Sequence, residues 1–187
     1  IAESAQTYLN RLADDPFAVA AVAHAGHPLF AFGLLDLSDA TAGGPGWNQP
    51  LAMPAVVALT LAGDGTTLPA GLIPLRPNDD APHLDEAAAT LGWLAASPPI
   101  RMQIVPLAGP AGADFDDVAA ACGSRTDRPV ARISDETSPR HCAVAPLAAS
   151  AWLLGVDLLV PEHWSATPAA TDPWHADLHA LPLRWYV

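Results

Sequence analysis

The sequence contains no lysine, and eight arginines stand against 20 carboxylates, for a formal net charge of −12. Without an amine side chain the protein cannot form a Schiff base or hold pyridoxal phosphate. It also lacks the lysine used by P-loop proteins and protein kinases. A phosphate backbone must be neutralised by a basic patch, so nucleic acids and anionic membrane surfaces are not expected as direct partners.

Cysteine is also scarce: Cys122 and Cys142 are the only two, and they do not form a CxxC pair. This favours reduced, buried thiols over a disulfide framework. We expect no signal peptide, and the longest apolar run, residues 144–160, is interrupted by Pro146 and Asp157. Such a run is typical of a core helix followed by a strand rather than a membrane span. We therefore expect a cytoplasmic protein.

Charged residues make up only 15% of the chain and apolar residues 51%, whereas an ordinary soluble domain is about 25% charged. Interface cores are depleted in charge and enriched in aromatic residues, so six tryptophans in such a chain fit a subunit that buries surface against a partner. The alternative is that alanine, leucine, proline and glycine are abundant because of a GC-rich genome, which by itself lowers the charged fraction.

The pattern after residue 100 predicts alternating elements. Strands are expected at 101–107, 129–133 and 156–160, and helices at 114–122 and 139–154. This alternation is typical of βαβ units. It predicts an α/β fold, a layered, mainly parallel or mixed sheet with helices on its faces.

The first part of the chain predicts an N-terminal helical segment over 4–26 and a buried strand over 28–37. Residues 55–62 and 68–75 flank an Asp-Gly turn, which indicates a β-hairpin. Two prolines in the second hairpin strand favour a position at a sheet edge, because proline cannot donate to a ladder.

At 187 residues the chain has the length of one domain. We assign residues 1–160 to a single α/β domain and residues 161–187 to a C-terminal tail. With four prolines and three tryptophans, the tail is too aromatic for a disordered segment. It is expected to pack on the same domain or on a partner, with residues 183–187 adding as an edge strand.

Two histidines in the tail are candidate metal ligands. Asp172 and Pro173 suit the start of a short helix, on which His175 and His179 share one side. Both can reach one ion, but the residues between them do not form a zinc-binding HExxH motif. A zinc site needs further ligands, which the sequence does not bring to the pair. The alternatives are boundary histidines beside a packed Trp-Leu stripe, or one histidine acting alone as an acid or base.

A polar island follows the predicted strand 129–133. It contains Asp135, Glu136, Arg140 and His141. Ligands in open α/β sheets gather at the carboxyl ends of strands, so these four side chains are the first candidates for a small-molecule site.

Other signatures of catalysis or cofactor binding fail. His141 and Cys142 are adjacent, so on a helix their side chains point about 100° apart. No GxSxG motif is present, and the stretch GPAGAD at 109–114 lacks the third glycine of a dinucleotide fingerprint. We expect no cofactor, with zinc as the weak alternative.

These observations favour a non-enzymatic accessory or structural subunit that buries an apolar, charge-poor surface in a larger assembly. Its partner would be another protein or further copies of the chain, with no nucleic acid and no membrane. The alternative is a small-molecule enzyme, a metal-assisted hydrolase or lyase, using His175 and His179 or the island at 135–141.

Overall fold

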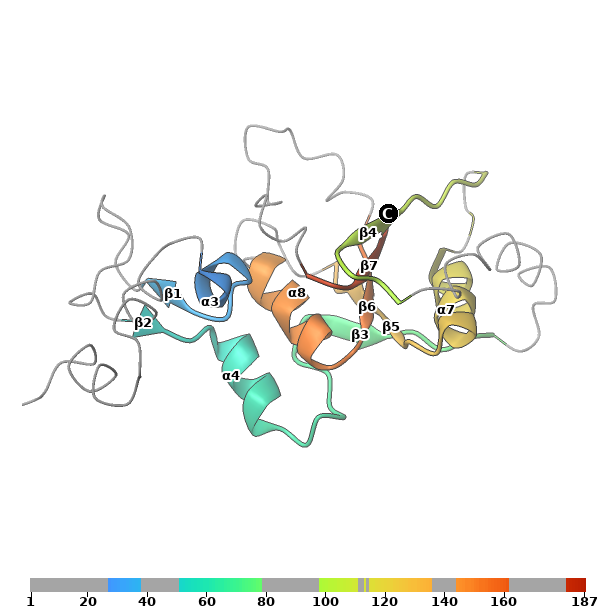
Figure 1. The fold of residues 1–187 in the computed structure, drawn as a ribbon. Helices are drawn as coiled ribbons and strands as arrows, with labels where there is room; N and C mark the ends of the chain where they lie inside the picture. Colours follow the sequence, from blue (N-terminus) through green and yellow to red (C-terminus); the bar gives the residue numbers. More distant parts are fainter. Residues whose placement is uncertain are drawn as a thin grey trace, which may run out of the picture.

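The computed structural model describes residues 27–37, 51–78, 98–110, 113, 115–135, 144–161 and 181–187. Within these ranges the chain forms a five-stranded, mostly parallel mixed sheet with helices packed against it (Figure 1). The α/β class predicted from the alternating pattern is therefore confirmed.

The main sheet has the strand order β3-β5-β6-β7-β4. Its strands are β3 (Leu72–Pro74), β4 (Gln103–Val105), β5 (Val130–Ile133), β6 (Asp157–Leu159) and β7 (Arg184–Tyr186). β3 runs antiparallel to β5, and every other neighbouring pair is parallel. Strands β4, β5 and β6 confirm the three strands predicted after residue 100, with slightly shorter bounds.

The helices lie in layers around this sheet. They are α3 (Pro28–Ala31), α4 (Ala55–Ala62), α7 (Phe115–Thr126) and α8 (Val144–Leu153). α7 and α8 confirm the helices predicted in these regions, as far as the chain is described. α4 packs against α8, on the side of α8 away from the sheet (Figure 1). A separate antiparallel pair joins β1 (Asp36–Leu37) to β2 (Leu51–Ala52).

Strands β6 and β7 are buried along their whole length, and since successive strand residues point to opposite sides, they face a core on each side of the sheet. Trp185 and Leu158 belong to the core under α8, together with Leu147 of that helix. Tyr186 and Leu159 belong to a second core, under α7. The mostly parallel sheet is therefore covered by α8 on one face and by α7 on the other.

The strand predicted over 28–37 is wrong. Residues 28–31 form α3, and only the pair at 36–37 is extended. His27 caps the helix, its Nδ1 accepting from the Leu29 backbone N–H at 3.3 Å. Pro28 suits the first turn of the helix. Proline lacks a backbone N–H, and an N–H at this position would have no acceptor within the helix.

The turn after α3 makes a close approach to α8. Gly33 has φ 69°, and a Cβ at this position would lie 2.7 Å from the Ala145 Cβ. Phe32 packs edge-on against Trp152, with ring centroids 5.9 Å apart. Glycine is therefore required here both by the backbone conformation and by the lack of space.

The predicted hairpin is also wrong, because its first strand is helix α4 and its second pairs with β5. A short apolar run such as AVVALTLA reads equally as a buried strand or a buried helix. The Thr60 hydroxyl donates to the Val56 carbonyl one turn back, at 2.8 Å. The edge position predicted for the second strand is correct, since β3 is outermost.

β7 does not add at an edge as predicted, but lies between β6 and β4. Both its aromatic residues, Trp185 and Tyr186, are fully buried. A nearly continuous apolar run is typical of a central parallel strand rather than an edge strand, and this was the signal to follow. The helical segment predicted over 4–26 and most of the predicted tail, residues 162–180, lie outside the described residues.

Candidate functional site

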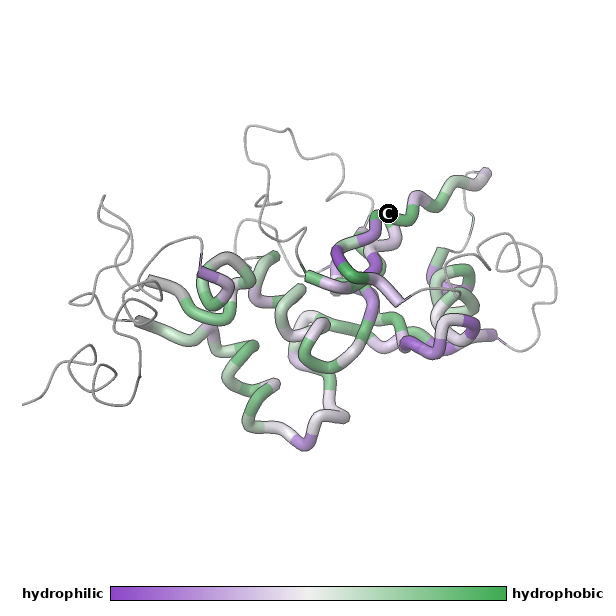
Figure 2. The backbone as a smooth tube through the Cα atoms, viewed as in Figure 1, coloured by the Kyte–Doolittle hydropathy of each residue, from purple (hydrophilic) through white to green (hydrophobic). Residues whose placement is uncertain are grey.

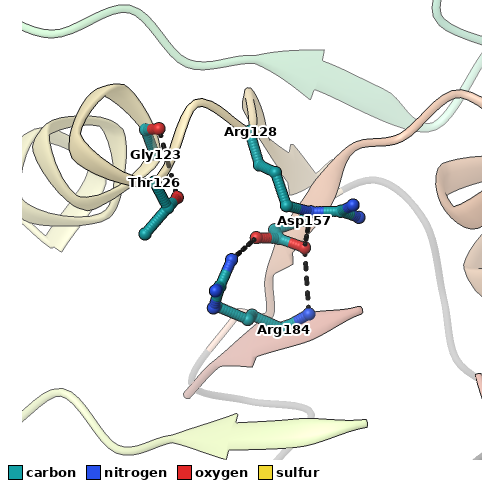
Figure 3. A network of polar contacts seen from close by, with 5 residues as sticks. All are labelled: Gly123, Thr126, Arg128, Asp157 and Arg184. Carbon is teal, nitrogen blue, oxygen red and sulfur yellow. Dashed lines mark hydrogen bonds and ion pairs between the residues drawn. The ribbon is translucent and has the colours of Figure 1, made fainter. Parts of the chain in front are cut away.

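A polar network joins three segments on the α7 side of the sheet (Figure 3). Asp157 of β6 is fully buried. Its Oδ1 accepts from Arg128 Nε at 3.0 Å and from the Arg184 backbone N–H at 3.0 Å. Its Oδ2 accepts from Arg184 Nη1 at 3.1 Å. One carboxylate therefore ties the loop after α7 to strands β6 and β7.

The loop that carries Arg128 is a tight turn. The Arg128 backbone N–H donates to the Gly123 carbonyl at 3.1 Å, and the Thr126 hydroxyl donates to the same carbonyl at 3.2 Å. Asp127 lies in the left-handed region, at φ 53°. A Cβ on Gly123 would come within 2.7 Å of the Arg128 carbonyl oxygen. This turn aims the arginine at Asp157.

The network lies at the amino ends of the parallel strands. Asp157 is the first residue of β6 and Arg184 the first of β7. Gln103, the first residue of β4, is in register with Arg184. Ligands in open α/β sheets bind at the opposite, carboxyl ends. The network is therefore best understood as a tie that fixes strand register.

Two further groups on the same face are held in their neutral forms. Burial, with a smaller effect of the Asp157 carboxylate, raises the pKa of the Tyr186 phenol, and burial raises the pKa of the Cys122 thiol. The Tyr186 hydroxyl has no hydrogen-bond partner among the described residues. A thiol whose pKa is raised by an apolar environment is a poor nucleophile. This face carries no activated nucleophile in the part of the chain described.

Of the predicted small-molecule site, Asp135 alone is described. It is exposed, two residues beyond the carboxyl end of β5. Glu136, Arg140 and His141 lie outside the described residues, so the island stays a prediction.

The predicted metal ligands His175 and His179 also lie outside the described residues. Among the residues that are described, no group of three or more histidine, cysteine, aspartate or glutamate side chains could hold a metal ion. The possible zinc site therefore remains a prediction from the sequence.

Exposed apolar residues lie along α4 and just before it, on either side of its buried stripe. Val57 and Thr60 of this helix are buried, whereas Leu59 is 66% and Leu61 55% exposed. Figure 2 shows hydrophobic colour along most of α4. We define the α4 surface by the exposed residues Met53, Ala55, Leu59, Leu61 and Ala62. A helix on the outside of a soluble domain normally carries polar residues on its outer face, and α4 does not.

A single charge adjoins the α4 surface. Asp64, just after the helix, is the one charged residue between positions 51 and 75. Its Oδ1 accepts from the backbone N–H groups of Thr66 and Thr67 at 2.9 and 3.2 Å and from the Thr67 hydroxyl at 3.4 Å. The Thr66 hydrogen bonds, backbone first, lower the pKa of Asp64. The carboxylate is therefore ionised and fixed in position at neutral pH.

Sequence reasoning missed the Asp157 network because its members are 27 and 29 residues apart and form no motif. One signal existed: Asp157 and Arg184 each interrupt an apolar run. A charge within a strand that is otherwise apolar must find a buried partner. Because a buried charge needs a partner of opposite sign, Asp157 and Arg184 could have been predicted to pair.

None of the helices described is long and apolar enough to span a membrane. In the comparisons, no family model matches the chain, and neither a curated protein nor a solved structure gives a significant match.

Proposed function

We propose that the protein is a non-enzymatic accessory or structural subunit that buries the α4 surface in a larger assembly. The observation that carries this proposal is the exposure of Leu59 and Leu61 on a helix that has no charged residue. The proposed location is the cytoplasm, and the proposal needs no cofactor.

Burial of this surface is favourable on simple grounds. A leucine side chain gains about 1.5–3 kcal/mol when it moves from full exposure to full burial. Contiguous exposed apolar residues on a soluble domain are typical of interaction sites, whereas single ones are common. The surface joins Met53 to the exposed residues of α4, and the neighbouring α8 is also free of charged residues. The low fraction of charged residues in the chain, 15%, supports the same proposal.

The experiment is affinity purification of the tagged full chain from its native source, followed by size-exclusion chromatography with light scattering. We expect a stoichiometric complex. The double variant Leu59→Gln/Leu61→Gln should lose the complex. Ile100→Gln should keep it, because Ile100 is 92% exposed but lies outside α4. A monodisperse monomer with no stoichiometric partner would overturn the proposal.

A further inference from the structure

We propose that the α4 surface docks a basic protein, which presents an apolar face with a lysine or arginine beside it, and not a second copy of this chain. This inference rests on the proposed function and names the chemistry of the partner. The surface joins exposed leucines to a fixed carboxylate at one end of the helix. A complementary partner must match both features.

The overall charge separates the two kinds of partner. Each copy carries a formal net charge of −12 and no lysine. Association of two copies would bring like charges together, whereas a basic partner is attracted to the same field from a distance. Electrostatic complementarity of this kind raises the rate of encounter and disfavours wrong partners.

Asp64 supplies the local part of the recognition. Oδ1 of Asp64 accepts from the backbone N–H groups of Thr66 and Thr67 and from the Thr67 hydroxyl. The carboxylate is exposed, so a cation on the partner can reach it. Because the carboxylate is already held in place, pairing with it requires little further loss of side-chain freedom. The cation on the partner must lie beyond the C-terminal end of α4.

The edges of the main sheet are weaker docking candidates. Ile104 is exposed on β4, but the strand has three residues and is flanked by Pro99 and Pro106. At the opposite edge β3 contains Pro74, which cannot donate to an added strand. Short strands and prolines are the devices by which proteins block pairing at sheet edges. The α4 surface carries no such protection.

The probe is a synthetic helical peptide of about 18 residues, long enough for a stable helix, with leucines at i, i+3, i+4 and i+7 and lysines elsewhere. Its control is a shuffled isomer of the same composition without an apolar face. Binding of each labelled peptide to the full chain is measured by fluorescence anisotropy. We expect the amphipathic isomer to bind at least about tenfold more tightly, a difference of about 1.4 kcal/mol.

Variants then locate the site on the protein. Leu59→Gln should lower the affinity for the amphipathic peptide about tenfold, and Ile100→Gln should leave that affinity unchanged. Asp64→Asn should lower the affinity about threefold at low salt. That difference should vanish as salt rises from about 0.05 to 0.5 M, because exposed charges are then screened.

Equal binding of the two isomers, or no effect of Leu59→Gln, would overturn the inference. Dimerisation of the chain alone that Leu59→Gln abolishes would overturn it in favour of a second copy. Binding to phosphatidylcholine vesicles that Leu59→Gln abolishes would overturn it in favour of a membrane. A native complex that survives the Leu59→Gln/Leu61→Gln double variant would remove α4 as the docking site. Only the absence of any complex would remove the subunit role itself.

Discussion

The two faces of the main sheet are built from different chemistry. The core under α8 consists of alanine, valine, leucine and isoleucine side chains with Met102 and Trp185, and α8 itself has no charged residue. On the face under α7, Asp157 and Arg184 are buried beside Tyr186 and Cys122. α7 also forms an ion pair with the sheet, Asp116 to Arg132, at 3.2 Å. One sheet therefore has a dry face and a charged face.

We infer that the two faces have different roles: one stabilises the fold and the other sets the alignment of β7 against β6. Apolar packing tolerates repacking as long as volume is kept, so the α8 face stabilises the fold without dictating how β7 aligns. The Asp157 carboxylate accepts from both the backbone N–H and the guanidinium of Arg184, and these bonds form in one alignment of β6 and β7. A slip by one residue would place the arginine in the apolar core under α8. We infer that the charged face specifies the position of β7.

The largest expected effect lies on the dry face. Trp185→Ala should lower the free energy of unfolding by about 4 kcal/mol, because it leaves a large cavity in a core where the side chain is fully buried. The measurement is urea unfolding followed by circular dichroism. Ile104→Ala, on the neighbouring β4 where the side chain is 55% exposed, should cost less than about 1 kcal/mol. Equal losses in the two variants would contradict the assignment of this core.

The next effect lies on the charged face. Asp157→Leu should cost about 3 kcal/mol, because it removes the carboxylate that pairs with the buried Arg184. Adding Arg184→Met should recover most of that loss, since a buried ion pair can often be replaced by apolar residues of similar volume.

A register marker tests the inference about β7. We expect the double variant Asp157→Leu/Arg184→Met to be stable. The alignment of β7 with its neighbours should be less well fixed, so amide hydrogen exchange in residues 184–186 should be faster. If exchange there matches the unaltered protein at equal stability, the network does not specify register.

The sequence predicted the α/β class and the alternating segments after residue 100, because length and turn residues separate strands of three or four residues from helices of ten or twelve. It failed over 28–37 and 55–62, where short apolar runs carry no decisive period. It also misplaced β7, since strand order depends on contacts between distant segments. Arg184 pairs with Asp157, 27 residues earlier, and β4 lies on its other side.

The candidate site was predicted less well than the fold. The polar side chains singled out in the sequence form local clusters, and only Asp135 lies in the described part of the chain. The α4 surface was hidden by the assumption that 55–62 is a strand, because a buried strand also reads as a continuous apolar run. In a helix Val57 and Thr60 turn inward, whereas Leu59 and Leu61 stay exposed on different sides of the buried stripe.

The smallest effect at neutral pH is expected from Tyr186→Phe. The hydroxyl is buried and has no partner within the described residues, so its removal should leave stability unchanged or raise it by about 1 kcal/mol. The informative range is alkaline. Burial raises the pKa of Tyr186 above its ordinary value of 10.0. Above pH 10 the unfolded chain then loses the tyrosine proton while the folded chain keeps it, and rising pH favours unfolding.

The absence of lysine makes this titration unusually clean, because only cysteine, tyrosine, arginine and the terminal amine remain to titrate at alkaline pH. Urea unfolding between pH 7 and pH 11 should show stability falling at alkaline pH, with Tyr186 and Cys122 each contributing up to about 1.4 kcal/mol per pH unit. Tyr186→Phe should flatten that fall. Cys122→Ala should flatten the part that begins near pH 9, because burial also raises the pKa of Cys122 from 9.0. An alkaline fall that persists in the Tyr186→Phe variant would show that the charged face does not hold this phenol in its neutral form.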